Sequence, residues 1–135
     1  MKIVLDTNVL VSSLLSPNGA PAAVLQLVIS GRVTICFDAR ILSEYREVLR
    51  RAKFGFDVTL IEDVFEFLVA EGVLIASEPL SLSLPDAADA MFIEVGVAGV
   101  ADYLVTGNLK HFPPTQRHGL SVVSPRAFIQ TVVEA

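Results

Sequence analysis

The stretch "KIVLDTNVLV" at residues 2–11 decides how the chain begins to fold, because an apolar β-strand pattern is interrupted by a carboxylate. An ionised carboxylate among apolar side chains must be paired, bound to a cation or left at the edge of the core. Asp6 also precedes a helical pattern, so it could be the N-cap of that helix. The side chains that the fold brings beside Asp6 must decide between a cap and a functional site.

Short β-branched runs alternate with helical patterns along the chain. We expect strands at residues 2–6, 33–37, 73–76, 102–106 and 121–124. We expect helices at residues 8–15 and 22–30, then helices capped by Asp38, Asp57, Asp86 and Ser124 that end near Lys53, Gly72, Ala98 and the end of the chain. This alternation is typical of a mostly parallel sheet covered by helices on both faces. The sequence therefore predicts the α/β class with a sheet of about five strands.

The length and composition favour one domain spanning residues 1–135. Hydrophobic residues make up 53% of the chain, yet no apolar run approaches the roughly 20 residues that cross a bilayer. The N-terminus has no signal-peptide pattern, so we expect a soluble, cytoplasmic protein without a membrane partner. Cys36 lies in an apolar run and is interpreted as a buried hydrophobic residue. The net charge of −5 counts against broad nonspecific binding of nucleic acids but allows carboxylates gathered around divalent cations.

Oxygen-bearing side chains follow four of the predicted strands. In parallel sheets, binding sites form beyond the carboxyl ends of the strands, where the next helices begin. Asp6, Glu44, Asp89 and Asn108 all fall in such positions. Carboxylate and amide oxygens suit Mg²⁺ or Mn²⁺ and do not suit Zn²⁺. Two such ions would activate a water and stabilise the leaving oxygen of a phosphodiester, whereas one ion would activate the water alone.

Two neighbouring acids have simpler explanations. Asp86 is better explained as a helix cap, and this leaves Asp89 free for another task. Glu47 lies in a row with Arg51, where an (i, i+4) ion pair on the surface explains it. Glu44 borders the buried stripe of the same helix, and a carboxylate there requires another reason.

The remaining polar groups and one helix allow more than one interpretation. His111 and His118 lie in a polar, Pro-rich loop and are expected to be surface residues rather than catalysts. The helix at 57–72 is apolar beyond one face, so it is either an ordinary buried helix or the contact surface of a homodimer, a higher oligomer or a partner. A basic group follows Glu44 on its helix and fits either the helix dipole or an RNA backbone: Arg46, Arg50, Arg51 and Lys53.

The segments "MKIVLDTNVLVSSL", "SEYREVL", "PDAADAMFIEVGVAGVADYLVTGN" and "NLKHF" together resemble the PIN domain family, specifically its single-domain, toxin-like branch. The resemblance covers nearly the whole chain. It implies a three-layer α/β/α sandwich and an endoribonuclease that cleaves single-stranded RNA, with Mg²⁺ or Mn²⁺ as cofactor. It also implies a small antitoxin protein as the inhibitory partner.

The resemblance also assigns residues. The acidic positions of the family fall on Asp6, Glu44 and Asp89, and the fourth falls on Asn108, where many members have Asp. Asn keeps an oxygen ligand but loses the charge. Thr7 and Thr106 match hydroxyl positions that would orient the carboxylates or a water on the metal. Lys110 is the basic residue nearest this set in sequence, and with Arg46, Arg50 and Arg51 it is the candidate for binding substrate.

Two rival functions remain open at this point. A catalytically weakened domain could keep the fold and act as an RNA-binding or protein-interaction module, which the neutral Asn108 favours. An aspartyl-phosphate enzyme could also place its nucleophile at Asp6, although that chemistry commonly has a second acid where Asn8 stands.

Overall fold

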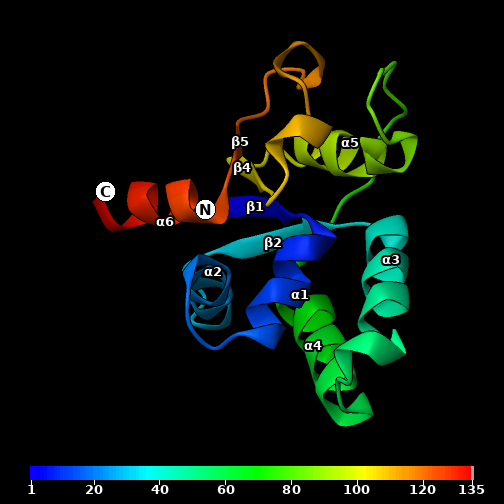
Figure 1. Cartoon of the computed structure of the whole chain (residues 1–135). Coiled ribbons are helices and arrows are strands. Elements are labelled where there is room, and N and C mark those ends of the chain that lie inside the picture. Colours follow the sequence, from blue (N-terminus) through cyan, green and yellow to red (C-terminus); the bar gives the residue numbers. More distant parts are fainter. Residues whose placement is uncertain (135) are drawn as a thin grey trace.

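The computed structural model describes residues 1–134 as one parallel sheet covered by helices (Figure 1). The strands are β1 (Lys2–Leu5), β2 (Thr34–Phe37), β3 (Val73–Leu74), β4 (Tyr103–Val105) and β5 (Val122–Val123). The helices are α1 (Thr7–Leu15), α2 (Ala20–Ile29), α3 (Ala39–Leu49), α4 (Val58–Glu71), α5 (Ala90–Ala98) and α6 (Pro125–Glu134). Four 3₁₀ turns connect them: η1 (Ala52–Phe54), η2 (Ala87–Asp89), η3 (Leu109–His111) and η4 (Pro114–Gln116).

The strand order in the sheet is β3-β2-β1-β4-β5, and each neighbouring pair is parallel. This confirms the predicted α/β class and the five strand positions, with each strand shorter than its apolar run. β1 is the central strand, where Ile3 aligns with Ile35 of β2 and with Tyr103 of β4. Ile3, Val4 and Leu5 are all at most 1% exposed. A strand buried on both faces needs such a continuous apolar run, which explains why "KIVL" shows no polar alternation.

The helices form layers on the two faces of the sheet. Figure 1 shows α1, α2 and α4 on one side of β1 and β2, and α5 on the other side. α3 contacts both α1 and α5, so it spans the edge at which β1 and β2 end. Within residues 1–134, none of the helices has the length and apolar character needed to cross a membrane.

Local capping chemistry sets the starts of several helices, as the sequence predicted. In each case a side-chain oxygen accepts a hydrogen bond from a backbone N–H two or three residues later. The four caps and their donors are Asp38 with Ile41, Asp57 with Thr59, Asp86 with Ala88 and Ser124 with Ala127. The final residue of the last predicted helix, Ala135, lies outside the described residues.

The helix predicted to run to Lys53 is shorter than expected. α3 ends at Leu49, and the chain continues into the 3₁₀ turn η1, which Gly55 closes with a left-handed φ of 64°. Phe54 and Phe56 on either side of Gly55 are half-buried, and their rings stack with centroids 5.8 Å apart. The chain turns at Gly55, and both rings pack against the hydrophobic core.

Candidate active site

Asp6 follows β1 and is only 6% exposed. It stands at the N-cap position of α1, but its side chain makes no capping hydrogen bond. Its backbone N–H donates to the carbonyl of Val105 at 3.0 Å, and its Oδ2 accepts a hydrogen bond from Oγ1 of Thr106 at 2.7 Å. The carboxylate is therefore held toward β4, and Asp6 occupies the N-cap position of α1 while its side chain is bound by Thr106.

The Thr106 hydroxyl is fully buried and is both a hydrogen-bond donor and an acceptor. It donates its proton to Asp6 and accepts a hydrogen bond from the backbone N–H of Asn108 at 3.0 Å. Asn108 thus fixes the rotamer of Thr106 through its main chain, and Thr106 fixes one oxygen of Asp6.

Glu44 reaches the same edge of the sheet from α3. Its Oε2 accepts a hydrogen bond from the hydroxyl of Thr7, the first residue of α1. The next residue, Tyr45, is fully buried and donates its hydroxyl proton to the carbonyl of Leu5 at the end of β1. Burial, together with the nearby charges of Asp6 and Glu44, raises the pKa of Tyr45 well above its ordinary value. Tyr45 therefore stays protonated and anchors α3 to the end of β1.

Asp89 closes η2 directly before α5 and is 8% exposed. Its side chain makes no capping hydrogen bond, and its Oδ2 lies 3.2 Å from Nδ1 of His111. The pKa of Asp89 is raised to about 6, chiefly by burial and also by the charges of Asp6, Asp86 and Glu44, while His111 lowers it. Asp89 is therefore an acid in an environment that already contains like charges.

These side chains surround one small pocket of about 180 Å³ at the carboxyl edge of the sheet. Three of the four predicted ligand residues, Asp6, Glu44 and Asp89, line it. Asn108 is not part of this lining in the described structure. It contributes to the site through its backbone N–H. The complete lining is Asp6, Thr7, Asn8, Glu44, Val48, Arg51, Asp86, Asp89 and His111.

The donor chemistry of this pocket suits a hard divalent cation. Burial also raises the pKa of Asp6, with the Thr106 hydrogen bond opposing it, so the pocket holds carboxylates in a costly environment. A divalent cation offsets such charge and prefers oxygen ligands. Among residues 1–134, no three acidic, histidine or cysteine side chains already form a cation-binding cluster. Glu44 is instead turned to Thr7, and Asp89 to His111.

His111 differs from its sequence-based expectation, whereas His118 is exposed as expected. His111 lies on η3, half-buried, against Asp89 and in the lining of the pocket, so it is part of the candidate site as well as of the surface. The available signal was its place three residues after Asn108, in the segment that leaves β4 at the carboxyl edge of the sheet.

The predicted basic group is divided between two surfaces. Arg51, just beyond the end of α3, lines the pocket and lies 3.7 Å from Glu47 of α3. Arg46 instead places its guanidinium 4.6 Å from the ring centroid of Phe65 on α4. Arg50 lies 3.5 Å from Glu62, also on α4.

Lys110 is exposed on η3 beside His111. Of the proposed substrate-binding residues, Arg51 is the one that the structure places in the lining of the pocket.

Comparisons with known proteins agree with this architecture. The model of the PIN domain family matches residues 2–110. VapBC2 from Rickettsia felis, bound to a DNA fragment from its promoter, superposes with a TM-score of 0.60 at 18% identity, covering 92% of this chain and 98% of that chain. FitAB bound to the IR36 DNA fragment gives 0.59 at 17% identity, covering 93% and 95%. FitAcB from Neisseria gonorrhoeae gives 0.59 at 19% identity, covering 93% and 99%. No curated protein matches the sequence.

The fold and the pocket define an α/β domain with a cluster of carboxylates at the carboxyl edge of its central strands. Because the family match extends over most of its length, the chain belongs to the PIN domain family. PIN domains are generally nucleases. Because the sequence identity to these solved structures is low, the similarity supports the fold of the chain alone.

Proposed function

We propose that this PIN domain is a Mg²⁺- or Mn²⁺-dependent endoribonuclease that cleaves single-stranded RNA and acts as the toxin component of a toxin–antitoxin pair. The observation that carries the proposal is the convergence of Asp6, Glu44 and Asp89 on one pocket. They lie after β1, on α3 and at the start of α5, far apart in sequence, and the burial of Asp6 and Asp89 is costly without a positive charge.

Each group of side chains has a separate role in this proposal. Asp6, Glu44 and Asp89 hold the cation, which supplies positive charge to polarise water and to offset the charge of the phosphodiester. The hydroxyls of Thr106 and Thr7 orient Asp6 and Glu44 through the hydrogen bonds described above. Arg51 at the pocket and the exposed Lys110 provide positive charge for the RNA backbone.

Cleavage of a mixed RNA pool by the purified chain tests the proposal. We expect cleavage with Mn²⁺ or Mg²⁺ and none in a chelator. Asp6→Asn and Asp89→Asn, both checked for folding by circular dichroism, should cleave at least about 100-fold more slowly at the same Mn²⁺ concentration. Glu66→Gln, which neutralises an exposed carboxylate on α4, is the control and should match the parent. Parental rates in both Asp variants would overturn the assignment.

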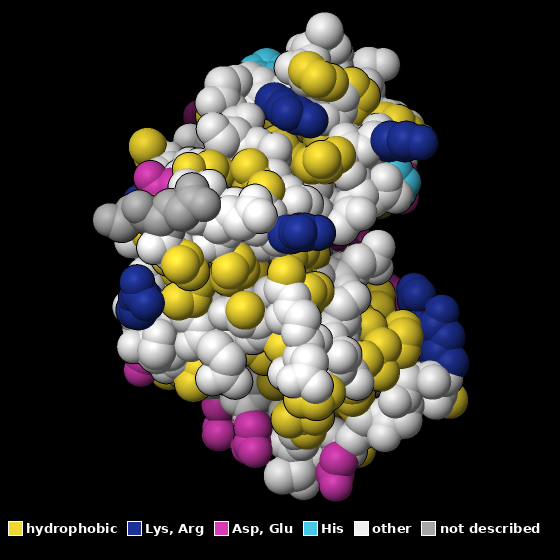
Figure 2. Space-filling view, turned by 60° about the vertical axis from the view of Figure 1, so that its left-hand side comes forward, with side chains coloured by type: hydrophobic (Ala, Val, Ile, Leu, Met, Phe, Trp, Pro, Cys, Tyr) yellow, Lys and Arg dark blue, Asp and Glu magenta, His cyan; other side chains and the backbone are white. Residues whose placement is uncertain are grey.

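The antitoxin partner also has a candidate surface. A groove of about 260 Å³ between α1, α2 and α4 is lined almost entirely by apolar side chains, including Leu14, Leu25, Leu60 and Phe67, with Asp63 as its one charged residue. Figure 2 shows apolar side chains spread over the lower part of the face that carries α2 and α6, with acidic side chains at its lower border. An apolar segment with flanking basic residues would complement such a groove.

Co-expression tests this partner surface. If a small DNA-binding protein is encoded next to this chain, we expect the two to co-purify. Leu60→Glu in the groove should prevent co-purification, whereas Val69→Glu should not, because Val69 is 62% exposed on α4 outside the groove. Equal capture by both variants would place the partner elsewhere.

A second candidate function is a catalytically weakened PIN domain that binds RNA or protein. Asn108 in place of an acid favours it, as does the lack of a ready-made cation cluster among the described residues. Calorimetry separates the two functions. The absence of Mn²⁺ binding by a folded chain that still binds its partner would select the second one.

A further inference from the structure

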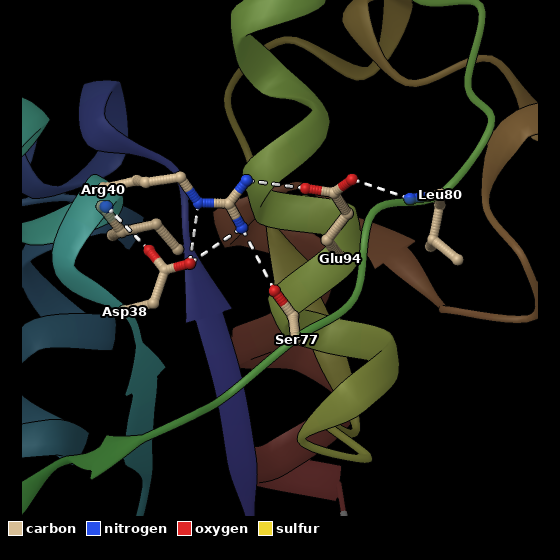
Figure 3. A network of polar contacts seen from close by, with 6 residues as sticks. Asp38, Arg40, Ser77, Leu80 and Glu94 are labelled. Atoms are coloured by element: carbon tan, nitrogen blue, oxygen red, sulfur yellow. Dashed lines mark hydrogen bonds and ion pairs between the residues drawn. The ribbon is translucent and has the colours of Figure 1, made fainter.

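Glu94 is a buried carboxylate outside the candidate active-site pocket. It lies on α5, is 6% exposed and has a separate partner for each oxygen (Figure 3). Its Oε1 accepts a hydrogen bond from Nη1 of Arg40 at 2.7 Å, and its Oε2 accepts one from the backbone N–H of Leu80 at 2.8 Å. A buried carboxylate is stable only with such partners, so these contacts are required by the fold.

Arg40 joins three segments of the chain through its guanidinium. Besides Glu94, it donates from Nε to Oδ2 of Asp38 at 2.9 Å and from Nη2 to Oγ of Ser77 at 3.1 Å. Figure 3 shows the guanidinium lying between the two carboxylates, with Ser77 at its lower side. Although the Arg40 side chain is 49% exposed, all three of its nitrogens are engaged, so it is bound within the protein rather than free for a phosphate. We call Asp38, Arg40, Ser77, Leu80 and Glu94 the clamp.

The clamp lies on the same two helices that carry two of the pocket acids. Arg40 precedes Glu44 by one helical turn on α3, about 6 Å along the axis. Asp89 stands at the start of α5, five residues before Glu94. Each helix therefore carries one clamp residue and one pocket acid.

The clamp also holds the segment that leads into the pocket. Residues 75–86 form no helix or strand and connect β3 to η2, where Asp86 and Asp89 lie. Ser77 and Leu80 of this segment are tied to Arg40 and Glu94. A long irregular segment has few internal constraints, so these contacts restrict the approach of the chain to Asp89.

Electrostatic repulsion acts against this arrangement. Glu44 and Asp89 line the same pocket, so two carboxylates of like charge lie across the contact between α3 and α5. Of the ion pairs found in residues 1–134, Arg40 with Glu94 is the one that joins these two helices. It is therefore placed to oppose their separation.

We propose that the clamp is a positioning device, in which the contact between Arg40 and Glu94 fixes the spacing of Glu44 and Asp89 and thereby sets the affinity of the pocket for a divalent cation. The inference rests on the proposed function, because it requires that the pocket binds a cation. Arg40 and Glu94 act through the two helices and do not contact the cation.

An electrostatic role and a positioning role of Arg40 predict opposite effects of Arg40→Met on the affinity for Mn²⁺. Removing the positive charge of Arg40 would strengthen Mn²⁺ binding if the residue acted only through space. If it positions Glu44 and Asp89, Arg40→Met should weaken Mn²⁺ binding about tenfold, as loss of a supporting contact around a metal site commonly does. Arg40→Lys keeps the charge but loses the fork that reaches several partners, so it should bind more tightly than Arg40→Met and more weakly than the parent.

The experiment is titration of the folded, metal-free full chain with Mn²⁺ in a calorimeter. Glu94→Gln should also lose about tenfold in affinity. In the metal-free protein, the amide of Leu80 should exchange its hydrogen faster in Glu94→Gln than in the parent, because Gln has one acceptor oxygen for the two donors, Leu80 and Arg40. Glu62→Gln, which breaks an ion pair between α3 and α4, is the matched control and should bind Mn²⁺ like the parent.

The outcomes separate this inference from the proposed function. If the parent does not bind Mn²⁺, or Asp6→Asn binds it equally well, the proposed function fails and the positioning role fails with it. If Asp6→Asn loses binding while Arg40→Met and Arg40→Lys stay within about twofold of the parent, the clamp does not position the site. A folded Arg40→Met that binds more tightly also overturns the inference. If Arg40→Met does not fold, Arg40→Lys and Glu94→Gln decide.

Discussion

Asp89→Asn should make the metal-free protein more stable at alkaline pH while removing its proposed activity. The folded protein raises the pKa of Asp89 from 3.8 to about 6, chiefly by burial and then by the charges of neighbouring acids. The folded state therefore binds the proton more tightly than the unfolded state does. Ionisation costs folding free energy fully above pH of about 6, and this cost disappears as the pH falls toward the ordinary pKa.

The size of the gain follows from the same shift. A change in pKa from 3.8 to about 6 corresponds to at most about 3 kcal/mol. Asn also loses the charge-assisted contact with His111, which lies 3.2 Å from Asp89, and this returns part of the gain. We therefore expect Asp89→Asn to raise the free energy of unfolding by about 1–2 kcal/mol at pH 8. At pH 4, where Asp89 of the parent is largely protonated in the folded state, the difference should fall close to zero.

Urea unfolding followed by circular dichroism, in a chelator at pH 8, 6 and 4, measures this difference. Glu66→Gln on the exposed face of α4 is the control and should show no comparable dependence on pH. Excess Mn²⁺ at pH 8 should stabilise the parent and not Asp89→Asn. The reasoning is refuted if Asp89→Asn is no more stable than the parent at pH 8, or if its advantage is the same at pH 4 and pH 8.

Three further changes test other parts of the structure. Val100 has a left-handed φ of 51° and is 77% exposed, so Val100→Gly should raise the free energy of unfolding by about 1 kcal/mol in urea. Thr106→Val removes the hydrogen bond to Asp6 and should cost about 1–2 kcal/mol of stability and about tenfold in Mn²⁺ affinity by calorimetry. Mn²⁺ at about 100 times its Kd should stabilise the parent by about 2.7 kcal/mol in a thermal melt and leave Asp6→Asn unchanged. Destabilisation by Val100→Gly, parental affinity in Thr106→Val or equal shifts in the melt would contradict the respective prediction.

The elements of the fold were predictable because their signals are local. The apolar run of β1, the caps Asp38 and Asp57, and the closing Gly72 each act within a few residues of their own position. The end of α3 was not predictable in this way. Phe54 and Phe56 pack, partly buried, against the hydrophobic core, whose residues come from elements far away in sequence.

The location of the candidate site was also predictable, since parallel strands bring their carboxyl ends to one edge whatever the loops do. Side-chain orientation at that edge was not. The family resemblance implied that Thr106 orients a carboxylate, but the sequence gives no reason for Asn108 to contribute its backbone N–H. Such choices depend on which rotamers the surrounding packing allows.

The sequence by itself determined the order of strands and helices along the chain, because periodicity and capping act locally. It also determined the parallel sheet and the edge at which Asp6, Glu44 and Asp89 gather. Tertiary structure alone decided that His111 joins the pocket, that Arg46 and Arg50 turn toward α4, and that Glu94 is an internal acid held by Arg40. The physical reason is that a buried charge is stable only beside a specific partner. Here the partners lie far apart in sequence, and only the folded chain brings them together.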